Sequence, residues 1–215
     1  MAFSQGCSDP FPDGDISLLY GILSERVSKP RMLFVTSGTF TGNLDFDKDG
    51  NGINDADKIC YDEKNTNFGF LPGPGTEYKA MIVDDNKQRR ACQFGDCTTT
   101  NQNLNWVLAP GTTYARMDTA GASPTILFTT NSAGIIPSGT TIQNRIHPES
   151  LTYWTGPDSQ WTTLGACTNF WNNPTTLNIG VYGSSDYLTS QAWSVTFPGP
   201  CNVLRHIVCV QQSSL

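Results

Sequence analysis

Hydrophobic and polar residues alternate most regularly near the C-terminus of the chain. In an extended segment 204–210, one side would carry Leu204, His206, Val208 and Val210, and the other side Arg205, Ile207 and Cys209. A period of two indicates a β-strand, because successive side chains of a strand point to opposite faces. We therefore predict a strand at the end of the chain.

The region from residue 153 to residue 210 is the best candidate for the hydrophobic core. It holds four of the five tryptophans and three of the seven cysteines, with few charged residues between them. Large aromatic side chains bury much apolar surface per residue. We expect this region to supply most of the core.

Shorter patterns predict further elements upstream. Apolar runs or alternation predict strands at residues 32–36, 78–83, 114–116 and 126–130. Helices are expected at residues 16–27, where apolar residues recur every three or four positions, at 54–60, which begins with capping residues, and at 103–108. A chain of 215 residues with these elements fits one mixed domain of ordinary size.

The cysteines predict disulfides. Cys201 and Cys209 lie near opposite ends of the predicted last strand, too far apart to bond to each other, so each needs a partner elsewhere. Cys92 and Cys97 favour a local disulfide over a zinc site, because no second cysteine pair or neighbouring histidine completes a tetrad. Paired cysteines indicate an oxidising, exported location.

Several motifs resemble known proteins. The run Tyr-Trp-Thr-Gly-Pro-Asp at 153–158, Cys167 with Trp171 four residues later, and the pair Cys201 and Cys209 resemble the C-terminal half of endostatin, whose fold is a variant of the C-type-lectin-like fold. Segments 33–44, 56–60, 78–84, 89–92, 105–108 and 128–131 resemble, in the same order, the leptospiral endostatin-like lipoproteins. The resemblance extends roughly over residues 32–212.

This resemblance implies an α+β, C-type-lectin-like fold of the endostatin type. It has a mixed, mainly antiparallel sheet, one or two flanking helices, and nested disulfides, Cys60–Cys209 and Cys167–Cys201, that join an early helix to the last strand. Residues 31–215 would form this domain, and residues 1–30 a lipoprotein tether.

Cys7 remains if the other six cysteines pair. The small residue Gly6 precedes it, an arrangement that resembles the end of a bacterial lipoprotein signal peptide, where the cysteine is acylated. The alternative is a free thiol. The family resemblance implies a monomeric adhesin, anchored by lipid to the outer-membrane surface, that binds host proteins such as complement factor H, laminin and fibronectin and is not an enzyme.

Composition argues against other partners. Charged residues make up 15% of the chain and the net charge is −6, which disfavours nucleic acid because phosphates require basic patches. The same charge disfavours contact of the whole molecule with an anionic membrane. No apolar run reaches the roughly 18 residues that span a bilayer.

Residues 45–57 carry five aspartates in thirteen positions. Oxygen-bearing side chains at alternate positions followed by glycine are what Ca²⁺ needs to gather six or more oxygens from one loop. The predicted ligands of a structural calcium ion are Asp45, Asp47, Asp49, Asn51, the carbonyl of Ile53, and Asp55. Lys58 stands where an EF-hand has its bidentate glutamate, and Asp45 or Asp57 could replace that carboxylate. The alternative is a solvated acidic turn at the start of the helix.

Lys87, Arg89 and Arg90 form the only basic cluster in the sequence. Beside the predicted Cys92–Cys97 loop, this cluster is a candidate ligand-binding edge. The alternative is the solvated end of a hairpin.

Neither histidine indicates an enzyme. His206 alternates within the last strand, His147 precedes a proline, and no spacing suggests a nucleophile, base and acid in mutual reach. A second hypothesis is a calcium-stabilised, carbohydrate-binding C-type-lectin-like module. The carboxylates of the sugar site of C-type lectins are absent at residues 172–175 and 193–195, which leaves stacking on Tyr182, Tyr187 or Trp193.

Overall fold

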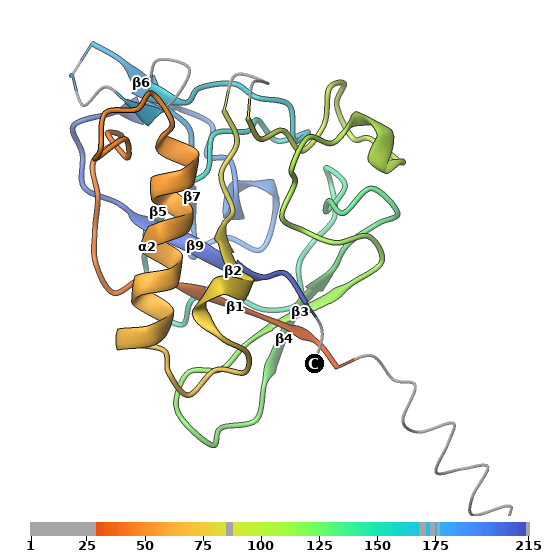
Figure 1. Cartoon of the computed structure of the whole chain (residues 1–215). Coiled ribbons are helices and arrows are strands. Elements are labelled where there is room, and N and C mark those ends of the chain that lie inside the picture. The colour runs from red at the N-terminus through yellow and green to blue at the C-terminus, as the bar shows by residue number, and fades with distance from the viewer. Residues whose placement is uncertain (1–28, 85–87, 168–170, 173–174, 176, 214–215) are drawn as a thin grey trace, which may run out of the picture.

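Helix α2 (Gly52–Thr66) lies against one face of a mixed β-sheet in the computed structural model (Figure 1). The structure describes residues 29–84, 88–167, 171–172, 175 and 177–213. Within these residues α2 is the only α-helix, and three short 3-10 turns accompany it: η1 (Gly75–Glu77), η2 (Thr100–Gln102) and η4 (Ser190–Ala192). The predicted α+β class is therefore confirmed.

Most described strands join one seven-stranded sheet. The strands are β1 (Arg31–Val35), β2 (Tyr78–Ala80), β3 (Thr113–Arg116), β4 (Thr125–Thr129), β5 (Thr152–Trp154), β6 (Ile179–Gly180), β7 (Tyr182–Ser184), β8 (Gly199–Pro200) and β9 (His206–Gln211). The order is β4-β3-β1-β9-β5-β7, β2 also pairs with β9, and β6 and β8 form a separate ribbon. Only β1–β3 and β5–β9 are parallel among the named pairs of the described chain.

Strand β9 is the centre of this sheet. One of its edges pairs with β1 over three residue positions, from Val208 to Val210. Its other edge is shared, because His206 and Ile207 pair with β5 whereas residues 209–211 pair with β2. The last strand therefore holds three separate parts of the chain in one sheet.

The two faces of β9 belong to two different hydrophobic clusters. Val208 and Val210 pack with one cluster, which includes Trp161 and Trp193. Ile207 and Cys209 pack with the other, which includes Trp154, Trp171 and the apolar face of α2. Both faces of β9 are covered because each cluster occupies one side of the sheet.

Three disulfides join the cysteine pairs that the sequence analysis predicts. Cys60 of α2 bonds to Cys209 of β9, with Cα atoms 5.5 Å apart, and Cys92 bonds to Cys97. Cys167 bonds to Cys201, with Cα atoms 5.7 Å apart. A Cβ atom on Gly42 would lie 2.1 Å from the Cys167 sulfur, so only glycine lets the chain pass this bridge.

Predicted strands at 32–36, 114–116 and 126–130 are present with ends within one residue of the observed bounds. The strand predicted at 78–83 ends at Ala80. The helix predicted at 103–108 is wrong, because Leu104 and Arg90 exchange backbone hydrogen bonds and Asn105 has a left-handed φ of 45°. The helix predicted at 16–27 lies outside the described residues.

Glu63 ties helix α2 to the chain that follows β1. Its carboxylate accepts hydrogen bonds from the backbone N–H groups of Ser37 and Gly38, from the Ser37 hydroxyl, and from the Asn67 amide. Burial by itself would raise the pKa of Glu63, but the bonds from Asn67, Ser37 and Gly38 outweigh it, and the pKa is lowered.

We expect Glu63→Gln to reduce the free energy of unfolding at pH 7 by roughly 1–2 kcal/mol, because the neutral amide keeps one acceptor oxygen where the carboxylate has two. A lowered folded-state pKa stabilises the protein above the unfolded pKa of about 4.3, and this contribution is lost as pH falls through the folded value. Urea unfolding from pH 7 to pH 3 should show the two proteins converging in acid. Glu149→Gln, at an exposed glutamate, should remain close to wild type throughout; a constant gap between wild type and Glu63→Gln would contradict the assignment.

Removing the Cys60–Cys209 bridge by Cys60→Ala with Cys209→Ala should destabilise the oxidised protein far more than removing Cys92–Cys97. The first bridge closes a separation of 149 residues and the second a separation of 5. The chain-entropy model gives about 5 and about 2 kcal/mol respectively. Chemical denaturation of the two double variants measures the difference, and equal losses would show that chain entropy does not set the stabilisation.

Candidate functional site

The acidic segment 45–51 is a loop that leads into the N-terminal end of α2 (Figure 1). The helix begins at Gly52 because the Asn51 side chain caps it, accepting the Asn54 N–H at 3.1 Å. Gly50 has a φ of 85°, which glycine adopts without strain. At the beginning of the loop, the backbone of Asp45 is held by a hydrogen bond from its N–H to the Trp171 carbonyl, at 3.2 Å.

Three aspartates of the loop converge. One carboxylate oxygen from each of Asp45, Asp47 and Asp49 lies within 4.8 Å of the others. Asp45 is buried, whereas Asp47 and Asp49 are exposed. Desolvation raises the pKa of Asp49, the bond from the Asn51 N–H opposes this, and the charges of Asp47 and Asp45 raise the pKa further. These carboxylates repel one another and form a candidate cation site.

The other predicted calcium ligands are used differently. Asn51 is the helix cap, and Asp55 accepts the N–H groups of Phe46 and Asp47 at 2.6 and 3.3 Å. The Ile53 carbonyl is placed unfavourably for the predicted role. Ile53 lies in the first turn of α2, where carbonyls point along the helix away from its N-terminal end.

The predicted basic edge is not formed as expected. Lys87 lies outside the described residues. Arg89 is buried and its guanidinium forms a bidentate pair with Asp57, with N–O distances of 2.9 and 2.8 Å. Arg90 donates to the Gln102 carbonyl. Arg89 is therefore paired inside the protein and does not belong to an exposed basic edge.

The Asp57–Arg89 pair forms one wall of an open polar pocket of about 550 Å³. Asp57 also accepts the Ala80 N–H, and Arg89 also donates to the Ala80 and Asn105 carbonyls. The pair therefore joins α2 to β2 and to the segment after the Cys92–Cys97 loop. Sequence reasoning missed it, because a separation of 32 residues leaves no local signal.

A second open pocket, of about 440 Å³, lies beside β7 and combines aromatic and polar side chains. Tyr182, Tyr187 and Phe197 line it together with Asp186 and Gln191. Trp193, predicted as a possible stacking face, is fully buried and stacks on Trp161 with ring centroids 4.8 Å apart. The prediction for Trp193 is therefore wrong, whereas both tyrosines reach the pocket.

Both histidines contact backbone groups. His147 Nδ1 accepts the Glu149 N–H at 3.1 Å, and burial lowers the pKa of His147. His206 Nδ1 lies 2.7 Å from the Thr36 carbonyl, which only accepts, so this nitrogen carries the proton. Neither contact resembles the pairing of a catalytic base with a nucleophile.

A family described as "Protein of unknown function (DUF1554)" matches residues 38–188. The chain belongs to the DUF1554 family. The part of the chain that matches contains the acidic loop, Asp57 and Arg89, and it ends before Cys201 and Cys209. Among curated proteins none matches this DUF1554 chain. No helix in the described part of it has the length and apolar character needed to cross a membrane.

Arg89→Met should reduce the free energy of unfolding by about 3 kcal/mol, because it leaves the mostly buried Asp57 carboxylate without its bidentate partner. The double variant with Asp57→Asn should recover part of this loss, since the Asp57 carboxylate would otherwise keep only the half-exposed Lys79, 3.6 Å away, as a charged partner. Urea unfolding at pH 7 measures both.

Lys58→Met is the matched control, because it breaks the exposed Lys58–Asp62 pair of the same helix and should cost less than about 0.5 kcal/mol. Equal losses for Arg89→Met and Lys58→Met would show that the buried pair does not hold the pocket wall.

Proposed function

We propose that this DUF1554 domain is a non-catalytic binding module, a bacterial surface adhesin with a C-type-lectin-like fold of the endostatin type. Its proposed ligands are host proteins such as complement factor H, laminin and fibronectin. The motifs shared with the leptospiral endostatin-like lipoproteins support the ligand class. The structural observation that supports a binding role is the set of exposed apolar side chains around the β6–β8 ribbon.

These side chains lie on segments that pairing and a disulfide bring to one end of the domain. Ile179 of β6 pairs with Pro200 of β8, and the adjacent Cys201 bonds to Cys167. Leu177 and Phe197 are 91% and 80% exposed, and Leu164, Ile179 and Leu204 are also exposed. Exposed apolar side chains on segments that are joined by pairing and a disulfide indicate a site for a protein partner. We name this set, Leu164, Leu177, Ile179, Phe197 and Leu204, the ribbon surface.

The scaffold beneath the ribbon surface favours binding. The Cys167–Cys201 bridge and the buried Trp154 and Trp171, with ring centroids 5.7 Å apart, hold the ribbon against the sheet. A pre-ordered surface loses little conformational entropy when a partner binds. With the ribbon held in this way, the loops around it can keep their apolar side chains exposed to solvent.

The proposed location follows from the cysteines. Three disulfides are kept in an oxidising compartment, which for a bacterial protein lies outside the cytoplasm. We propose that Cys7 is the acylated residue of an outer-membrane lipoprotein and that residues 1–30 are the tether. Cys7 lies outside the described residues, and mass spectrometry of the protein from its native membrane tests this assignment.

Surface plasmon resonance of the full oxidised chain should detect binding to at least one of immobilised factor H, laminin and fibronectin. Leu177→Ser with Ile179→Ser should weaken that binding about 30-fold, the equivalent of about 2 kcal/mol for a hot spot. Phe94→Ser is the matched control, because Phe94 is an exposed aromatic residue on the separate Cys92–Cys97 loop. No binding to any of the three ligands, or equal losses in both variants, would argue against the proposal.

The pocket beside β7 supports a carbohydrate-binding module as the second candidate. Aromatic rings such as Tyr187 and Phe197 can stack on sugar rings, while Asp186 and Gln191 can accept or donate hydrogen bonds. A glycan array with and without Ca²⁺ tests this function. Binding that Tyr187→Ala abolishes would favour the carbohydrate module over the adhesin.

A further inference from the structure

We propose that the acidic loop is a calcium site whose protein ligands are Asp45, Asp47 and Asp49. This ligand set is narrower than the one expected from the spacing of acidic residues, because only these three carboxylates converge and Asn51 caps α2. Asp47 and Asp49 each also accept one backbone N–H, from Asp49 and Asn51 respectively. The inference is independent of the adhesin proposal, since it concerns the loop before α2 and not the ribbon surface.

The buried carboxylate of Asp45 is the first observation. Asp45 is 7% exposed, and its Oδ2 accepts the Gly50 N–H at 3.1 Å. Its Oδ1 is buried and has no hydrogen-bond partner among the described residues. A buried charged oxygen without a partner is costly, so native proteins pair it or bind a cation there.

The geometry of the three carboxylates is the second observation. Two oxygens on opposite sides of a Ca²⁺ ion lie about 4.8 Å apart, which is twice the Ca–O distance of about 2.4 Å. The ligand oxygens of Asp45, Asp47 and Asp49 all lie within 4.8 Å of one another. The separations are therefore compatible with one ion bound by all three carboxylates.

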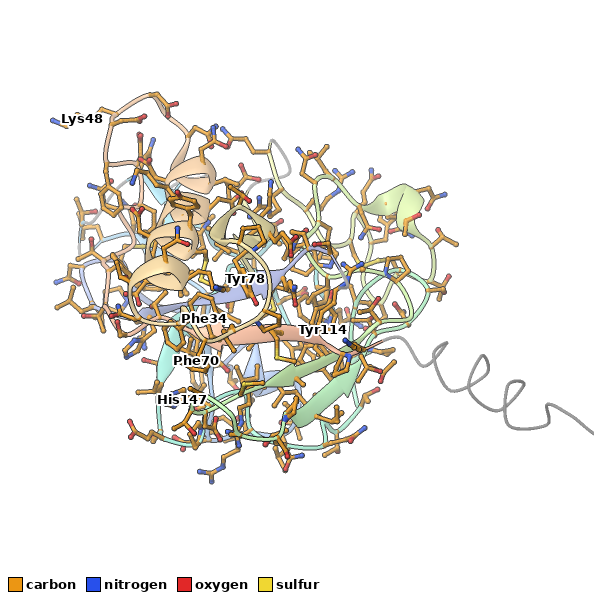
Figure 2. The ribbon with its side chains drawn as sticks, turned by 60° about the horizontal axis from the view of Figure 1, so that its bottom comes forward. Phe34, Lys48, Phe70, Tyr78, Tyr114 and His147 are labelled. Carbon is orange, nitrogen blue, oxygen red and sulfur yellow. A yellow bond between two sulfur atoms is a disulfide. The ribbon has the colours of Figure 1, made fainter. Side chains whose placement is uncertain are left out.

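No protein cation neutralises these charges in the described part of the chain. The ion pairs there do not include Asp45, Asp47 or Asp49. Lys48 stands between two of the aspartates in sequence, but Figure 2 shows its side chain directed away from the domain at the tip of the loop. The negative charge of the loop can therefore be neutralised by a cation from solution.

The ligand chemistry selects the ion. All three side chains offer hard oxygen atoms, whereas zinc sites are built from cysteine and histidine. Mg²⁺ requires near-ideal octahedral geometry and keeps most of its water, whereas Ca²⁺ accepts irregular sets of carboxylates and water. Three carboxylates with two of them exposed indicate the weak end of the calcium range, a Kd of about 0.1–1 mM, which suits an extracellular module.

Calorimetric titration of the full oxidised chain with CaCl₂ should give a single saturating isotherm. Thermal unfolding in about 10 mM Ca²⁺ should shift upward by roughly 3–7 °C, and the same concentration of Mg²⁺ should give a smaller shift. Asp45→Asn keeps the acceptor for Gly50 and removes the buried charge, so it should weaken calcium binding at least about tenfold.

Asp49→Asn is the second variant, because an exposed loop residue can be changed without risk to the fold, and it should weaken binding to a similar degree. Asp62→Asn is the control, since Asp62 is an exposed aspartate of α2 that does not belong to the cluster. Absence of calcium heat and of a thermal shift in wild type would overturn the proposal. Binding unchanged in both Asp45→Asn and Asp49→Asn would also overturn it, and equal shifts with Mg²⁺ would overturn the choice of calcium.

Discussion

The Cys60–Cys209 bond and the pairing of the strand that carries Cys209 are the constraint on which the rest of the structure depends. β9 pairs with β1, β2 and β5, which come from the first, the middle and the last third of the chain. The disulfide fixes α2 over this strand, and each face of β9 packs on its own hydrophobic cluster. A strand that shares one edge between two partners has little freedom to slip in register, because a one-residue shift would exchange the two faces.

Two carboxylates of α2, those of Asp57 and Glu63, help to fix the orientation of the helix on the sheet. Asp57 binds Arg89 and the Ala80 N–H on one side of the helix, and Glu63 accepts the N–H groups of Ser37 and Gly38 on another. Each carboxylate thereby replaces water with several donors from distant segments, which satisfies its charge and specifies one packing arrangement. The helix is held by its polar contacts as well as by its apolar face.

The acidic residues in and before α2 fall into two groups with different contacts. Carboxylates that face protein donors, such as Asp55 and Asp57, serve structure. Asp45, Asp47 and Asp49 face each other at the loop. Each accepts one backbone N–H, but none has an ion pair in the described part of the chain. The loop is also attached to Trp171, next to the β6–β8 ribbon, so an ion there would sit close to the segment that presents exposed apolar side chains. Calcium binding at the loop would therefore stabilise the same end of the domain that carries the ribbon surface.

The sequence by itself determined that helix and strands share one domain, and it determined the strands β1, β3, β4 and β9 and the start of α2, because these depend on local periodicity and capping. The reach of a disulfide also required separate partners for Cys201 and Cys209. The family resemblance supplied the nested bridges. Only the tertiary structure decided that Arg89 is an internal partner of Asp57, that Trp193 is buried, and that Asp45 faces Asp47 and Asp49 while Asp55 does not. Charge and aromatic character can be read from composition, but which group a side chain meets is set by contacts between residues far apart in the chain.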